Sequence, residues 1–195
     1  IEEAIANSYK NIKAIMPVDL FGLPARYRII QDIAKKYDLK IIADAAQSFG
    51  ASKDDKKVGT FGDITTTSFF PAKPLGCYGD GGAIFTDSDE YNKTLRSLAV
   101  HGKGADKYDN IRVGMNSRLD TIQAAILLEK LSIFSDEINS RNKIADLYRE
   151  KLKDLPATCQ TIPQGYKSVY AQFSILFDTE MFRFSNNLKN TSFAQ

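Results

Sequence analysis

The chain has 195 residues, of which 43% are apolar, and a formal net charge of +2. This near-neutral charge gives no support to nucleic acid or an anionic membrane as a partner, and apolar runs of about five residues cannot span a bilayer. One histidine and two cysteines exclude a histidine-rich metal site and a disulfide scaffold, and they favour a reducing cytoplasm.

The first part of the chain alternates between strand and helix patterns. Residues 12–18 form a short apolar run that ends near a proline, which predicts a buried strand. Apolar residues at helical spacing predict a helix over 26–37, and a β-branched run predicts a second strand over 39–46. This order is that of a βαβ unit, so we expect an α/β fold with a parallel sheet.

The middle of the chain predicts more short elements. Residues 52–63 are charged and glycine-punctuated, as in a hairpin or an exposed loop, and 64–70 and 82–86 have strand composition. Asp87 resembles a helix N-cap with Glu90 three residues later. Residues 101–118 form a long polar loop, which in a compact chain is usually functional or disordered.

A helical pattern then runs from Leu119 to about Leu155, and it allows a break near Ser135. Its apolar residues predict one buried stripe, formed by Leu119, Ile122, Ile126, Leu131, Phe134 and Ile138. Residues 168–177 alternate and predict a strand. The change from α/β alternation to long helix suggests a domain transition at about 120–156.

Two residues follow predicted strands and could carry chemistry. Asp44 comes at the end of the second strand and Lys73 after the third, so both belong at the carboxyl edge of the sheet, where α/β folds bind ligands. Pyridoxal phosphate needs an acid beside its ring nitrogen and a lysine for its aldehyde. The alternatives are a helix cap or solvated acid for Asp44 and an ordinary surface lysine for Lys73. Ser68 could donate to the phosphate or only form a turn.

Several motifs together resemble the DegT/DnrJ/EryC1/StrS family of sugar-nucleotide aminotransferases. The resemblance covers about residues 1–176 and is strongest in "DAAQS" with "SFFPAKPLG", supported by "VHGKG", "VGMNSRLDTIQAA", "PVDLFGLPA" and "SVYAQFSI". It implies a pyridoxal-phosphate enzyme with the aspartate aminotransferase fold (fold type I). Residues 1–120 would then be the later part of the cofactor-binding large domain, and 121–195 the linking helices and the start of a small domain.

The resemblance also implies roles for residues around the cofactor. Lys73 would form the Schiff base and shuttle protons, and Asp44 would pair with the pyridinium nitrogen. Gln47 would lie near the phenolic oxygen, and Ser68 would bind the phosphate.

The loop before the long helix would supply further contacts. Asn116 would reach the phosphate of the neighbouring subunit's cofactor in a homodimer with shared sites, although an N-cap role before Leu119 is the alternative. Arg118 would contact the anionic substrate, and the roles of His101 and Tyr108 stay open.

The chain departs from the family at both ends. Family members are nearly twice as long, and the upstream phosphate loop and the residue that stacks on the cofactor are not in this sequence. Residues 178–195 do not resemble the family's small domain. We therefore expect a fragment that is inactive by itself.

The expected activity is transfer of an amino group, from glutamate by family analogy, to a keto-sugar nucleotide for surface polysaccharide or amino-sugar synthesis. A sugar dehydratase is disfavoured because related dehydratases carry histidine at the position of Lys73. A non-catalytic regulatory protein and an inactive remnant remain alternatives. We expect no metal, nucleic acid or membrane as a partner.

Overall fold

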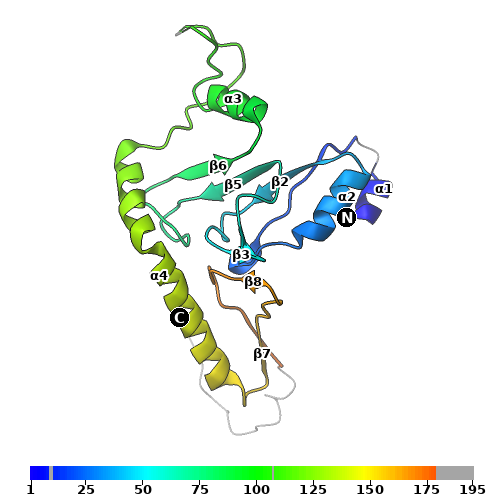
Figure 1. The fold of residues 1–195 in the computed structure, drawn as a ribbon, viewed down its shortest axis with the longest axis vertical. Helices are drawn as coiled ribbons and strands as arrows, with labels where there is room; N and C mark the ends of the chain where they lie inside the picture. Colours follow the sequence, from blue (N-terminus) through cyan, green and yellow to red (C-terminus); the bar gives the residue numbers. More distant parts are fainter. Residues whose placement is uncertain (9–10, 107, 179–195) are drawn as a thin grey trace, which may run out of the picture.

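The computed structural model describes residues 1–8, 11–106 and 108–178 (Figure 1). The final polar segment that departs from the family therefore lies almost wholly outside the described residues. The central sheet has the strand order β1 (Ala14–Ile15), β2 (Lys40–Asp44), β5 (Ile64–Ser68) and β6 (Gly82–Phe85). The β1–β2 and β2–β5 pairs are parallel and β5–β6 is antiparallel, which confirms the parallel βαβ unit and the α/β fold class.

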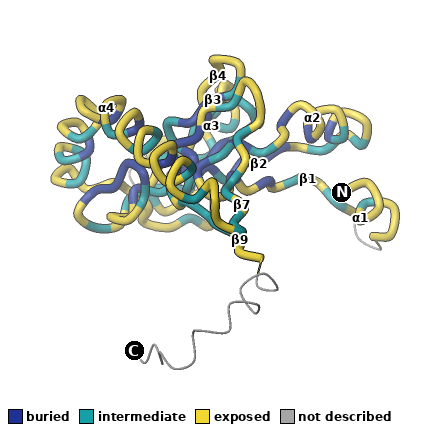
Figure 2. The backbone as a smooth tube through the Cα atoms, turned by 90° about the horizontal axis from the view of Figure 1, so that it is seen from below, coloured by how far each residue is buried: buried dark blue, intermediate teal, exposed yellow. Residues whose placement is uncertain are grey.

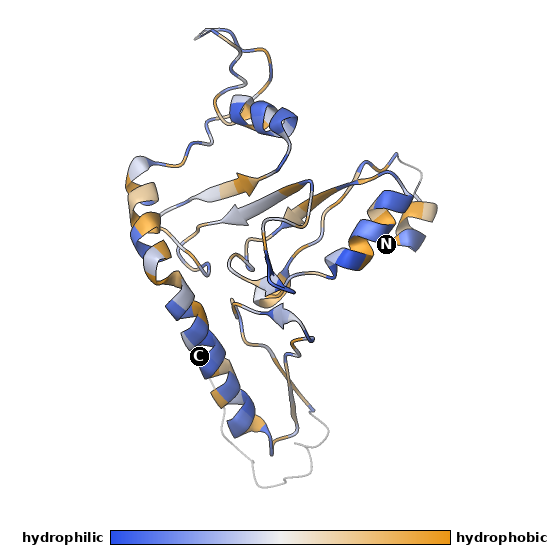
Figure 3. Cartoon of the chain, viewed as in Figure 1, coloured by the Kyte–Doolittle hydropathy of each residue, from blue (hydrophilic) through white to orange (hydrophobic). Residues whose placement is uncertain are grey.

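Helix α2 (Tyr27–Lys36) connects β1 to β2 and covers one face of the sheet. Its buried residues Tyr27, Ile30 and Ala34 pack with Ile41 and Ala43 of β2. Figure 3 shows the corresponding two-sided character of α2, with hydrophobic and hydrophilic residues alternating along its turns. The helical spacing of these apolar residues is what allows one face of the helix to be buried.

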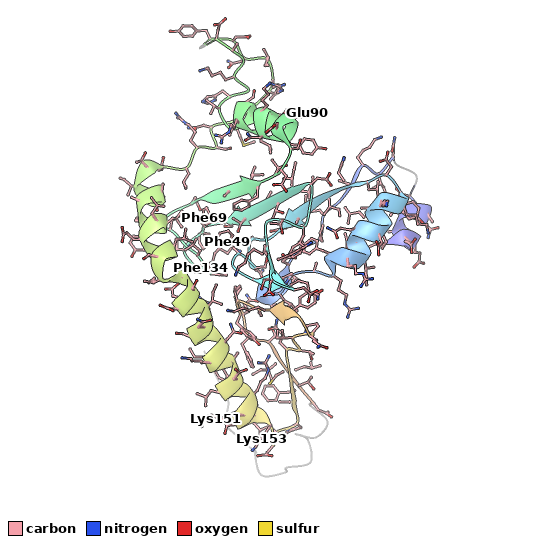
Figure 4. The ribbon with its side chains drawn as sticks, viewed as in Figure 1. Phe49, Phe69, Glu90, Phe134, Lys151 and Lys153 are labelled. Atoms are coloured by element: carbon pink, nitrogen blue, oxygen red, sulfur yellow. The ribbon has the colours of Figure 1, made fainter. Side chains whose placement is uncertain are left out.

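A second core joins the loops after β2 and β5 to helix α4 (Thr121–Leu152). The Phe49 ring lies 5.9 Å from the rings of both Phe69 and Phe134, between the sheet and the helix (Figure 4). The Figure 2 view shows the buried residues gathered in the middle of the molecule. This core fixes α4 against the part of the sheet that carries the candidate site.

Helix α4 differs in two respects from the sequence prediction. It is continuous through Ser135, without the break that the pattern allowed. Only Phe134 and Ile138 of the predicted stripe are buried, whereas Ile122 is 74% exposed. The reason is that α4 runs along one side of the molecule (Figure 1), so the described residues cover only part of its apolar surface.

Short elements complete the described fold. These are α1 (Glu2–Ala6), the 3-10 turn η1 (Leu20–Gly22), the hairpin of β3 (Ser52–Lys53) and β4 (Lys56–Lys57), helix α3 (Asp89–Leu98), and strands β7 (Ala157–Cys159), β8 (Tyr166–Lys167) and β9 (Ile175–Phe177). Strand β8 pairs with β3, and β9 pairs with β7. The hairpin predicted within residues 52–63 is confirmed over 52–57, where β3 and β4 pair.

Two local predictions are wrong. Ser88, not Asp87, caps α3, because the Ser88 Oγ accepts a hydrogen bond from the Tyr91 N–H at 3.3 Å. The predicted strand over 168–177 is only β9, because its first residues bind the turn at Gly22. The Val169 N–H and the Ser168 hydroxyl both donate to the Gly22 carbonyl at 3.0 Å.

Candidate functional site

The candidate site begins at the ends of two neighbouring parallel strands. Asp44 is the last residue of β2 and Ser68 is the last residue of β5. Asp44 is in register with Thr66, so Ser68 lies two residues beyond it. The predicted acid and hydroxyl are therefore brought to the same edge of the sheet.

Asp44 projects from the sheet face opposite to α2. Its neighbour Ala43 is buried against α2, and successive side chains of a strand alternate between faces. The Asp44 Oδ1 accepts a hydrogen bond from the Ala46 N–H at 3.0 Å, which closes a tight turn directly after the strand. The bond fixes the orientation of the carboxylate while its second oxygen remains available as an acceptor for a ligand.

Lys73 lies in a compact turn after β5. Its N–H donates to the Phe70 carbonyl at 2.9 Å, and the Cys77 N–H donates to the Phe69 carbonyl at 2.8 Å. A Cβ at Gly76 would lie 2.5 Å from the Pro71 carbonyl oxygen, so this close approach of the backbone requires glycine. Within the described part of the chain, the half-buried Lys73 side chain has no ion pair, which leaves its amine available for chemistry.

Helix α4 holds the later part of this turn. The Gln123 Oε1 accepts a hydrogen bond from the Tyr78 N–H at 2.8 Å, and the Lys130 Nζ donates to the Gly76 carbonyl at 2.5 Å. The Lys130 amine also lies 5.5 Å from the centre of the Tyr78 ring. Sequence reasoning missed these three contacts, because nothing in a helical pattern identifies which polar residues face a distant turn.

Gln47 joins the turn after β2 to the turn after β1. Its Oε1 accepts a hydrogen bond from the Phe21 N–H at 2.7 Å. Phe21 has a φ of 59°, a left-handed conformation that costs energy for a residue with a side chain. Because this contact uses only the Oε1 atom of Gln47, its amide NH₂ group can donate to other acceptors.

Arg118 lines a cavity of about 510 Å³ next to this edge of the sheet. The same cavity is lined by Thr66, the register partner of Asp44, and by Asp80. The predicted substrate residue thus lines a cavity that includes the register partner of Asp44.

Asn116 does not line this cavity, and its Oδ1 instead accepts a hydrogen bond from the Arg118 Nε at 2.9 Å. The N-cap alternative for Asn116 is wrong, because α4 begins at Thr121 and its N-cap residue is Asp120. His101 is exposed with a φ of 58°, and Tyr108 is 87% exposed. Figure 1 shows the loop that follows α3 extending away from the central sheet.

Sequence reasoning also missed Asp19, a fully buried acid in the turn after β1. The signal that could have found it is positional, because Asp19 follows the first parallel strand as Asp44 ends the second.

Among residues 1–8, 11–106 and 108–178, no cluster of potential metal ligands is present. No helix in the same ranges is both long and apolar enough to cross a bilayer.

A family model described as the DegT/DnrJ/EryC1/StrS aminotransferase family matches residues 1–192. A curated relative, the UDP-2-acetamido-2-deoxy-3-oxo-D-glucuronate aminotransferase of Pseudomonas aeruginosa, is 51% identical over 166 residues, which make up 85% of this chain and 46% of the relative. The chain therefore spans about half the length of the curated relatives it matches.

Solved structures agree with this assignment. A DegT DnrJ EryC1 StrS aminotransferase from Brucella abortus is 52% identical and superposes with a TM-score of 0.87, over 93% of this chain and 48% of that one. NtdA from Bacillus subtilis, determined with bound cofactor PMP, is 35% identical with a TM-score of 0.83, over 94% of this chain and 41% of that one.

Proposed function

The chain belongs to the DegT/DnrJ/EryC1/StrS aminotransferase family, and we propose that it carries the cofactor site of a pyridoxal-phosphate aminotransferase acting on a keto-sugar nucleotide. The observation that carries the proposal is the convergence of Asp44, Ser68 and the Lys73 turn at one edge of the sheet. The amino donor is glutamate by family analogy, and the setting is cytoplasmic synthesis of amino sugars or surface polysaccharide. The boundary near residue 120 between a large and a small domain belongs to the same proposal.

These residues fit pyridoxal phosphate by the chemistry of their donors and acceptors. Asp44 offers a fixed carboxylate oxygen for a protonated ring nitrogen, and Ser68 offers a hydroxyl for a phosphate oxygen. Gln47, whose Oε1 is engaged by Phe21, would present its amide N–H groups to the phenolic oxygen. Lys73 offers an amine outside any described ion pair for covalent attachment to the aldehyde.

When bound, the cofactor supplies an electron sink for the carbon that loses or gains a proton. Asp44 would hold the proton on the ring nitrogen, and this positive charge stabilises the negative charge that develops during proton transfer. Lys73 would take a proton from one carbon and return it to another, first as general base and then as general acid. Arg118 would bind an anionic part of the substrate at the neighbouring cavity.

The test uses a family-length chimera, in which this chain replaces the aligned segment of the Brucella abortus aminotransferase. The chimera with pyridoxal phosphate should show a visible absorbance band that borohydride removes, and Lys73→Ala should abolish the band and the transamination of a 3-keto UDP-sugar. Lys57→Ala, at an exposed lysine of β4, is the matched control and should retain both. A chimera that folds without such a band would refute the proposal and favour the non-catalytic alternative.

A homodimer with shared sites is part of the proposal and can be tested separately. If Asn116 acts on the partner's cofactor, a mixture of Asn116→Ala and Lys73→Ala chimeras should regain activity, because one site of each mixed dimer then receives both intact residues. Mixed dimers confirmed by mass that remain inactive would show that Asn116 serves its own subunit or has no role at the cofactor.

A further inference from the structure

Asp19 is a fully buried acid surrounded by hydrogen-bond donors. Its Oδ1 accepts from the Ala25 N–H and the Tyr27 hydroxyl, both at 2.8 Å, and its Oδ2 accepts from the Ser48 hydroxyl at 2.6 Å. Burying a carboxylate is unfavourable unless its oxygens are hydrogen-bonded, and here three donors converge on them. Burial raises the pKa of Asp19, an effect opposed by these bonds and reinforced by the nearby charge of Asp44.

The acid connects the turns that follow the first two parallel strands. The Asp19 N–H donates to the Asp44 carbonyl, and the Asp44 N–H donates to the Pro17 carbonyl, both at 2.9 Å. The Ser48 side chain that binds Asp19 ends the turn that begins at Asp44, and the Ser48 N–H donates to the Ala45 carbonyl at 3.1 Å. Asp19 therefore holds both ends of the segment that carries Asp44 and Gln47, with its backbone N–H at Asp44 and its carboxylate at Ser48.

The turn at Asp19 is itself held in a demanding conformation. After Phe21 with its left-handed backbone comes Gly22 with a φ of 90°, where a Cβ would lie 2.7 Å from the Ala171 backbone nitrogen. A left-handed Phe21 persists only if the surroundings enforce it. The Asp19 bond to the Ala25 N–H closes this turn from its other end.

We propose that Asp19 is a positioning residue whose buried carboxylate sets the placement of Asp44 and Gln47 against the cofactor ring. This inference rests on the proposed function, because it assigns Asp44 and Gln47 to the cofactor. Asp19 lies on the sheet face covered by α2, whereas Asp44 projects from the other face, so Asp19 acts through the backbone and through Ser48 rather than by touching the cofactor.

The charge of Asp19 matters as well as its shape. Asparagine has nearly the same size but offers one acceptor oxygen and one donor group. Because the Ala25 N–H can only donate, the asparagine oxygen would face Ala25 and Tyr27, and its amide group would face Ser48. The Ser48 hydroxyl would then lose its short bond to a charged oxygen and could only accept from the amide. Asp19→Asn should therefore weaken the link to the turn that carries Gln47 without creating a cavity.

The experiment compares Asp19→Asn, Ser48→Ala and Asp63→Asn in the family-length chimera. Asp63 is the control, because its carboxylate also accepts a backbone N–H of β2, from Ile41 at 2.9 Å, but at the opposite end of the strand. The dissociation constant of pyridoxal phosphate and the pH midpoint of the visible band are measured well below the melting temperature. The melting temperature of each variant is determined separately.

Asp19→Asn should weaken cofactor binding about tenfold, in line with the loss of one hydrogen bond to a charged group, and should move the pH midpoint of the band. Ser48→Ala should act in the same direction, and Asp63→Asn should change only the melting temperature. If Asp19→Asn does not fold, Ser48→Ala decides the question.

Three outcomes are informative. Variants at Asp19 and Ser48 that lower the melting temperature but bind the cofactor as the unmodified chimera does, with an unchanged midpoint, would overturn the positioning role and leave the proposed function standing. If Asp63→Asn changed the cofactor dissociation constant or the pH midpoint as much as Asp19→Asn does, the positioning role would be overturned too. The effect would then be a general consequence of perturbing the sheet. An unmodified chimera without the borohydride-sensitive band would overturn both proposals.

Discussion

Replacing Lys130 with methionine should loosen the turn that carries Lys73. The Lys130 Nζ donates to the Gly76 carbonyl at 2.5 Å in a partly buried position, and hydrogen bonds to charged groups contribute about 1.5–3 kcal/mol. Methionine keeps the apolar stem, so the variant removes the charged donor and little packing. Because each kcal/mol corresponds to about 2–4 °C in a domain of this size, the melting temperature of the chain should fall by about 3–12 °C.

Lys143→Met is the matched control, since Lys143 is exposed on the same helix and should tolerate the change within about 0.5 kcal/mol. Melting is followed by circular dichroism, and the rate at which the visible cofactor band forms is followed in the chimera. The Lys130 variant should form the band more slowly, because Gly76 lies three residues after Lys73 in the same turn. Equal melting temperatures and equal rates for the two variants would refute the reasoning.

Other changes should have separable effects. Asp44→Asn should still bind the cofactor at saturating concentration but lower the transamination rate of the chimera at least about 100-fold, since the ring nitrogen loses its charged partner; an unchanged rate at saturating cofactor would make Asp44 only a turn former. Gly76→Ala should lower the free energy of unfolding by about 1–3 kcal/mol, because the new methyl group would collide with the Pro71 carbonyl oxygen; urea titration measures this, and a neutral result would contradict the tight turn. Burial acts to raise the pKa of Asp63, but hydrogen bonds from the Ile41 N–H and the Lys40 side chain outweigh this effect and lower the pKa. Its stabilisation is thus present above about pH 4 and lost as the pH falls through the folded-state pKa. The difference in stability between Asp63→Asn and the unmodified chain should therefore shrink on acidification, and a difference that grows would be inconsistent with this sign.

The regular elements could be predicted because their periodicity survives in the sequence. The apolar spacing of α2 and the β-branched runs of β2 and β5 reflect burial on one side, so the βαβ unit and the edge that holds Asp44 and Ser68 follow from pattern alone. Lys73 was identified because prolines and glycines mark an unusual turn.

The errors arise where tertiary contacts override local pattern. Residues 168–171 alternate as a strand would, but Ser168 and Val169 use their hydrogen bonds on Gly22, which lies far away in the sequence. Ile122 has the regular helical spacing of a buried stripe, but it is exposed because no described element packs against it. Sequence reasoning misses Asp19 because burial of an acid depends on partners that a single sequence does not reveal.

The length of α4 has a mechanical consequence for the turn of Lys73. Lys130 is hydrogen-bonded to that turn. Arg149, nineteen residues along the same helix, donates to the Gln160 carbonyl at 3.0 Å and to the Tyr170 hydroxyl at 2.6 Å. At 1.5 Å per residue, Lys130 and Arg149 are separated by about 28 Å along the helix axis. A tilt of the helix by about 2° about Arg149 would then move Lys130 by about 1 Å, a displacement that can cost about 100-fold in rate when reacting groups must meet. Under the proposed function, the position of the segment after α4 would therefore control how accurately the Lys73 turn is placed relative to the cofactor.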